Sequence, residues 1–125
     1  MALYEIRAQA RFEAAHHLTA YRGSPEPTHG HSWVVEACVT CDELNDEGFG
    51  VDFVELESRL GELAGRFDGG DINAVSPFDE ISPTTENLAR WFHTELATIL
   101  APVEVDSITL WEAPGCSVTY RPGEP

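Results

Sequence analysis

The sequence predicts an α+β domain in which four antiparallel strands carry two helices on one face of the sheet. Residues 3–16 and 29–41 alternate between apolar and polar side chains, which is typical of half-buried strands. Two later stretches repeat apolar residues at helical spacing. Residues 104–112 and 116–121 then read as two strands around a Pro114-Gly115 turn. The order strand, strand, helix, helix, strand, strand favours one antiparallel sheet covered by the helix pair.

The first two strands are expected to pair. The loop between them, residues 17–28, contains the chain breakers Gly23, Pro25 and Pro27. One face of the first strand is apolar and ends in His16. In the second strand, His29 and His31 share a face with four apolar residues: Trp33, Val35, Ala37 and Val39.

Each helix has a start and a stop signal. Asp52 is placed to cap the first helix, whose apolar residues run from Phe53 to Phe67, and the segment 68–71 ends it as a turn. Thr84 or Ser82 is placed to cap the second helix, and Pro102 stops it. Its apolar positions are Leu88, Trp91, Phe92, Leu96 and Ile99.

Length and charge limit the function classes. The 125 residues suit one domain spanning 1–125. The net charge is −15, and all 7 basic residues are arginine, so the protein's field repels nucleic acids and anionic membranes. No apolar run is long enough to span a bilayer. We expect a cytoplasmic protein in which Cys38 and Cys41 are ordinary buried thiols; with Cys116 the count is odd, which argues against a disulfide framework.

His16, His29 and His31 are the strongest functional signal. Residues two apart in a strand point to the same side, so His29 and His31 can aim at one point, and strand pairing would bring His16 beside them. Three neutral imidazoles form a zinc site with an open fourth position, which is typical of catalytic zinc. The alternative is that each is an ordinary surface or core histidine. His17 is expected to face the opposite side and to be solvated.

The histidine-bearing face is expected to lie opposite the helices. An apolar face left uncovered on so small a domain would need other copies of the chain to bury it.

Five motifs occur in an order and spacing that resemble the 6-pyruvoyl-tetrahydropterin synthase and 6-carboxytetrahydropterin synthase family. They are Phe12–His16, His29–His31, Val51–Phe53, Pro83–Asn87 and Leu110–Glu112. The resemblance implies the tunnelling fold, assembled into an oligomeric barrel, commonly a homohexamer with active sites between subunits. It implies Zn²⁺ on His16, His29 and His31, and a pterin-like substrate, 7,8-dihydroneopterin triphosphate. It also implies that Glu112 anchors the pterin ring and that Thr84 and Thr85 line the pocket.

Two departures bear on the chemistry. Most members place a cysteine a few residues before His29, whereas here that segment holds Glu26, as in a subgroup that releases 6-hydroxymethyl-dihydropterin. Gly69 stands where the family has a histidine, next to a matching Asp68. Glu26 is therefore the expected catalytic base, with Asp68 and Asp71 as weaker candidates. Arg22 is the candidate for binding phosphate.

Three functions follow from these patterns. The first is a zinc-dependent lyase that cleaves the C6 side chain of a dihydropterin and releases the 6-hydroxymethyl product. The second is 6-carboxytetrahydropterin synthesis for deazapurine formation. The third is a repurposed protein that keeps zinc and a pterin-like pocket without the family's catalysis, or with another substrate.

Overall fold

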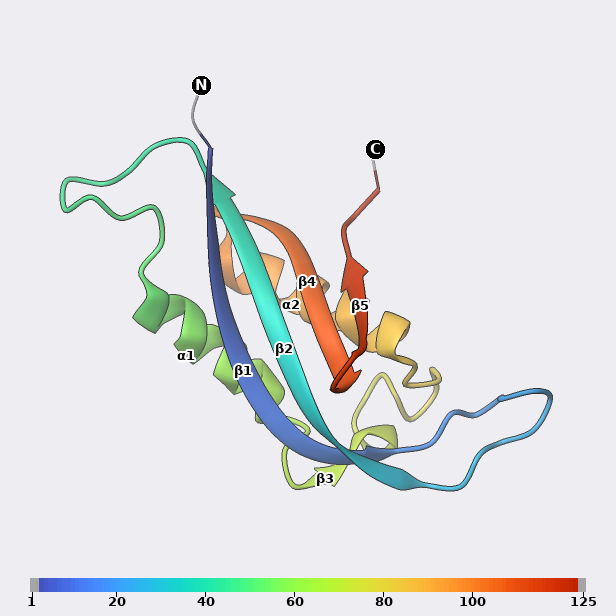
Figure 1. The fold of residues 1–125 in the computed structure, drawn as a ribbon. Helices are drawn as coiled ribbons and strands as arrows, with labels where there is room; N and C mark the ends of the chain where they lie inside the picture. The colour runs from blue at the N-terminus through green and yellow to red at the C-terminus, as the bar shows by residue number, and fades with distance from the viewer. Residues whose placement is uncertain (1–2, 124–125) are drawn as a thin grey trace.

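The computed structural model describes residues 3–123, and its two helices and four longer strands follow one another in the predicted order (Figure 1). The long strands pair antiparallel along their whole length, with His16 directly opposite His29. The elements are β1 (Tyr4–His16), β2 (His29–Cys41), α1 (Phe53–Ala64), β3 (Gly70–Asp71), a short 3-10 turn η1 (Ile72–Ala74), α2 (Thr85–Leu100), β4 (Glu104–Ala113) and β5 (Cys116–Tyr120). None of the helices within residues 3–123 has the length and apolar character needed to cross a bilayer.

The sheet differs from the predicted one by a short fifth strand. Its order is β3-β1-β2-β4-β5, and β3 pairs parallel with β1 through Ala14 and Ala15. The segment 68–71 was expected to be only a turn. It turns at Gly69, whose N–H donates to the Glu13 carbonyl at 2.7 Å, and the chain then continues beside β1. Two residues are too few for an alternation pattern, so the sequence carries no strand signal there.

Both helices begin where their capping residues predict. The Asp52 carboxylate accepts the Val54 N–H, and the Thr84 hydroxyl accepts the Asn87 N–H. Of the predicted apolar positions, Phe53 is 58% exposed, whereas the residues facing the sheet are buried. These buried residues include Leu56, Leu60, Leu63, Leu88, Phe92 and Leu96.

The histidine-bearing face is the face that the helices cover, and the expectation that it lies opposite them is wrong. Phe12, Trp33 and Val35 belong to the same buried cluster as the inner residues of α1 and α2. The chain's own helices therefore bury this face without other copies. The physical reason is that a two-layer domain needs its apolar sheet face against its helices, and the histidines continue that face beyond the helix pair.

The conformation of Gly69 explains why glycine stands there. Its φ of +77° lies in the left-handed region, where a Cβ crowds the adjacent backbone. Beyond Gly69 and its two chain neighbours, no atom lies within 4 Å of the position that a Cβ would take.

We expect Gly69→Ala to lower the free energy of unfolding by about 1 kcal/mol, because only backbone strain is added. Urea denaturation measures this. Gly61→Ala, inside α1, is the matched control, and its expected effect is neutral or stabilising because alanine favours the helix. Equal effects at the two positions would show that the left-handed turn does not form.

We expect Leu60→Ala to lower the free energy of unfolding by about 2–5 kcal/mol, because Leu60 is fully buried between α1 and the sheet. Val54→Ala, on the exposed side of the same helix, is expected to change it by less than about 0.5 kcal/mol. Both values come from urea denaturation at one protein concentration. A small effect of Leu60→Ala would contradict the packing of α1 described above.

Candidate metal centre and active site

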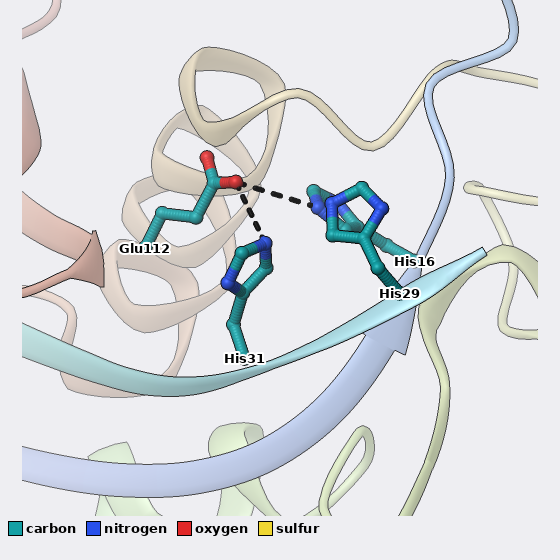
Figure 2. Close-up of side chains that lie close together, drawn as sticks. All are labelled: His16, His29, His31 and Glu112. Atoms are coloured by element: carbon teal, nitrogen blue, oxygen red, sulfur yellow. Dashed lines mark ion pairs between the residues drawn. The ribbon is translucent and has the colours of Figure 1, made fainter. Parts of the chain in front are cut away.

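Three histidines and one glutamate meet at the end of the helix-covered face (Figure 2). The pairing of His16 with His29 sets two imidazoles side by side, and His31 follows two residues along β2. Glu112 reaches the same point from the end of β4. One donor atom from each residue lies within 4.8 Å of the others, which is a spacing that a single metal ion can bridge. The predicted convergence of the three imidazoles is thus present.

Backbone carbonyls orient two of the rings. The Pro83 carbonyl lies 2.9 Å from Nδ1 of His16, and the Pro27 carbonyl lies 2.9 Å from Nδ1 of His29. A carbonyl can only accept, so each Nδ1 must carry the proton. In the neutral ring, Nε2 is then left with its lone pair, and this tautomer is the form that binds a metal.

His16 is the most enclosed member of the cluster. It is 1% exposed, and its ring meets the Trp33 ring edge to face at 5.0 Å between centroids. Burial lowers the pKa of His16 and so favours the neutral ring. Within residues 3–123, Nε2 of His16 and Nε2 of His31 are buried and have no hydrogen-bond partner. Buried polar atoms without partners are unusual, and a cation between them would satisfy both.

Glu112 lies closer to the histidines than a ring-anchoring role requires. Its Oε1 is 2.9 Å from Nε2 of His31 and 3.6 Å from Nε2 of His16. Its Oε2 accepts a hydrogen bond of 2.8 Å from the hydroxyl of Thr85, the first residue of α2. The protein therefore supplies a donor near the fourth position that the histidine pattern alone left open.

Glu26 also lies beside the cluster. Its Oε1 is 3.7 Å from Nε2 of His29 and accepts the Leu18 N–H at 2.9 Å. The Glu26 N–H in turn donates to the Leu18 carbonyl at 3.1 Å. These bonds hold a half-buried carboxylate at the rim of the site.

Three other candidates have contacts elsewhere. Asp68 accepts the Glu13 N–H, and Asp71 accepts the Asn73 N–H at the start of η1. Arg22 is exposed at the tip of the 17–28 loop, where its guanidinium lies 5.3 Å from the centre of the Tyr21 ring. The single chain does not bring these three side chains into the cluster.

A hollow of about 350 Å³ opens beside Glu112. It lies where the start of α2 meets the turn between β4 and β5, and Thr85 and Glu86 form its helix side. The remaining lining comes from Glu112, from Gly115 in the turn, and from residues 116–118 at the start of β5. Thr84 does not line this hollow, because its hydroxyl is engaged in capping α2.

Sequence reasoning missed several contacts of the site. The backbone carbonyls of Pro27 and Pro83, which orient His29 and His16, cannot be predicted from a side-chain pattern. The bond from Thr85 to Glu112 joins residues 27 apart and depends on how α2 packs on β4. His17, which was expected to be solvated, is half-buried, and its backbone pairs with the Asn73 amide.

The chain is similar in sequence to known pterin synthases. The family model described as 6-pyruvoyl tetrahydropterin synthase matches residues 5–123. A 6-carboxy-5,6,7,8-tetrahydropterin synthase of Aquifex aeolicus is 29% identical, covering 94% of this chain and 98% of its own. The Synechocystis protein of the same name is 30% identical, and its alignment covers 75% of each chain.

Solved structures show the same fold. The 6-pyruvoyl tetrahydropterin synthase of Caenorhabditis elegans superposes with a TM-score of 0.85 at 19% identity, covering 98% of both chains. A Plasmodium vivax 6-pyruvoyltetrahydropterin synthase, solved as a catalytic-residue mutant with alanine in place of a glutamate, gives 0.79 at 16% identity, covering 99% of this chain and 100% of that one. The match over nearly the whole length shows that this chain belongs to the 6-pyruvoyl tetrahydropterin synthase family of pterin-processing enzymes.

Proposed function

We propose that the protein is a zinc-dependent lyase that cleaves the C6 side chain of 7,8-dihydroneopterin triphosphate and releases 6-hydroxymethyl-dihydropterin. One observation carries the proposal. Beside three converging imidazoles, the position near His29 is held by the carboxylate of Glu26, and the 17–28 loop contains no cysteine.

His16, His29 and His31 would hold the zinc through Nε2. The donor set fits, because nitrogen ligands suit Zn²⁺ and two of the rings are already fixed in the metal-binding tautomer. Bound zinc would supply Lewis-acid polarisation of the oxygens on the substrate side chain.

The hollow beside Glu112 would take the pterin ring. A pterin presents an amino group and a ring N–H side by side, and a carboxylate can accept both. Glu112 and Thr85 stand at the wall between the hollow and the histidines. A ring bound there would direct its C6 side chain toward the metal.

Glu26 would act as the base. Cleavage requires removal of the proton from the hydroxyl on the second side-chain carbon. The bond between the first and second carbons then breaks, its electron pair passes to the carbon attached to the ring, and a proton is returned there. The second product is a phosphorylated two-carbon aldehyde. The Leu18 N–H holds the Glu26 carboxylate beside His29, where it can reach such a hydroxyl. The catalytic glutamate of the Plasmodium vivax relative supports a glutamate in this role.

The second candidate is 6-carboxytetrahydropterin synthesis, which is favoured by the names of the Aquifex aeolicus and Synechocystis relatives. A third candidate keeps zinc and a pterin-like pocket without turnover, and Gly69 favours it because the family's histidine is missing there.

Assembly into a homohexamer in the cytoplasm belongs to the same proposal. The outer strand β5 borders the hollow and pairs on one side only, with β4, among the described residues. A neighbouring copy could continue the sheet there and close the hollow. The side chains of three further candidates, Asp68, Asp71 and Arg22, make contacts elsewhere in their own chain. They would take part in catalysis or phosphate binding only at such an interface.

We expect one zinc ion per chain, lost in His29→Ala and His31→Ala, measured by elemental analysis after dialysis. Zinc should also raise the melting temperature of the wild-type protein, because a ligand that binds only the folded state stabilises it. His93→Ala is the matched control, since the His93 ring lies against the Val105 carbonyl, outside the cluster. Retention of zinc by both cluster variants would contradict the metal site.

We expect Glu26→Gln to lower turnover of 7,8-dihydroneopterin triphosphate by at least about 100-fold while zinc stays bound. Glutamine keeps the oxygen that accepts the Leu18 N–H but cannot take up a proton at neutral pH. Mass spectrometry of the wild-type products separates the candidates. A 6-carboxy product would favour the second function, and the absence of any product the third. Full activity of Glu26→Gln would remove Glu26 from the mechanism.

A further inference from the structure

The short distances between the Glu112 carboxylate and the imidazoles indicate a role for Glu112 in addition to binding the pterin ring. We propose that Glu112 is a fourth protein ligand of the metal in the substrate-free protein, bound through Oε1, and that Thr85 is the residue that positions it. The proposal rests on the metal site proposed above.

The first argument is distance. Two donors of a tetrahedral zinc ion stand about 3.3 Å apart when each bond is about 2.0 Å. Oε1 of Glu112 is 3.6 Å from Nε2 of His16 and 2.9 Å from Nε2 of His31. These separations bracket the expected one, so an ion bound by the imidazoles would also lie within reach of this oxygen (Figure 2).

The second argument is chemical. Nδ1 of His16 carries its proton toward the Pro83 carbonyl, which leaves a lone pair on Nε2. In the neutral ring, a carboxylate oxygen 3.6 Å from that nitrogen is repelled by its lone pair. Nε2 of His31 lies at ion-pair distance from Oε1, 2.9 Å, but neither it nor Nε2 of His16 has a hydrogen-bond partner of acceptable geometry within residues 3–123. A divalent cation among the donors turns the repulsion into coordination.

The third argument concerns Thr85. Its hydroxyl, on a residue only 8% exposed, donates to Oε2 of Glu112 at 2.8 Å and leaves Oε1 directed at the histidines. Thr85 opens α2, where the helix dipole favours negative charge. The preceding Pro83 carbonyl orients His16. Residues 83–85 therefore orient both the imidazole of His16 and the carboxylate of Glu112.

As a consequence, the metal in the substrate-free protein would have four protein ligands and no free coordination position. A pterin that donates hydrogen bonds to Glu112 would compete with the metal for the same carboxylate. Ring binding would then free a coordination position for the substrate side chain, which couples recognition of the ring to access to the metal.

Co²⁺ is the probe, because its visible absorption reports coordination number and donor type. The apoprotein is titrated with Co²⁺ alone, without pterin, in the wild type and in Glu112→Gln, Thr85→Val and Thr85→Ser. Glu104→Gln, at the far end of the same strand, is the matched control. Circular dichroism checks that each variant is folded.

We expect Glu112→Gln to weaken Co²⁺ binding at least tenfold and to lower the visible absorptivity, because more than one water would replace the carboxylate and the coordination number would rise. Thr85→Val should shift the spectrum in the same direction, whereas Thr85→Ser and Glu104→Gln should resemble the wild type. If Glu112→Gln does not fold, the contrast between Thr85→Val and Thr85→Ser decides.

Two outcomes would overturn the proposal, and they are distinguishable. Co²⁺ that binds the wild type, with Glu112→Gln or Thr85→Val unchanged in affinity within twofold and in spectrum, would reject the fourth ligand but leave the three-histidine site intact. Failure of the wild type to bind Co²⁺ would reject the metal site of the proposed function as well.

Discussion

The pairing of β1 with β2 is the constraint on which the site depends. His16 stands opposite His29 and Ala14 opposite His31, with Phe12 opposite Trp33 one step inward. A slip of one residue would turn one strand's histidines to the outer face and would expose its share of the core. Burial of Phe12 and Trp33 therefore fixes the register of the two strands, and this register places the imidazoles side by side. The indole N–H of Trp33 adds a bond across the pair to the Ala14 carbonyl at 3.1 Å.

The start of α2 is the second element that organises the site. Its packing on β4 brings Thr85 to Glu112, and the residues just before it reach back to β1 at His16. The histidine–glutamate cluster, the hollow and the helix cap consequently share one short segment. A shift of α2 along the sheet would displace the groups that orient Glu112 and His16, so the geometry of these two side chains depends on a helix that contributes neither of them.

Local patterns predicted most of the fold. Strict alternation in residues 3–16 and 29–41, and the capping residues Asp52 and Thr84, indicated elements that the structure confirms. The three-histidine convergence followed from the same alternation. The choice of sheet face could not be predicted in this way, because alternation shows that a face is apolar and not what covers it. The contacts of Glu112 and Glu26 depend on tertiary packing and on main-chain partners, which carry no side-chain pattern.

The loop that carries Glu26 is closed near its base. The bonds between Leu18 and Glu26 join the two ends of the loop before the chain enters β2, and the turn from Tyr21 to Ser24 lies beyond them. Movement or lengthening of that outer turn is thereby separated from His29. The outer turn is therefore the part of the loop whose length and composition can change without displacing Glu26 or His29.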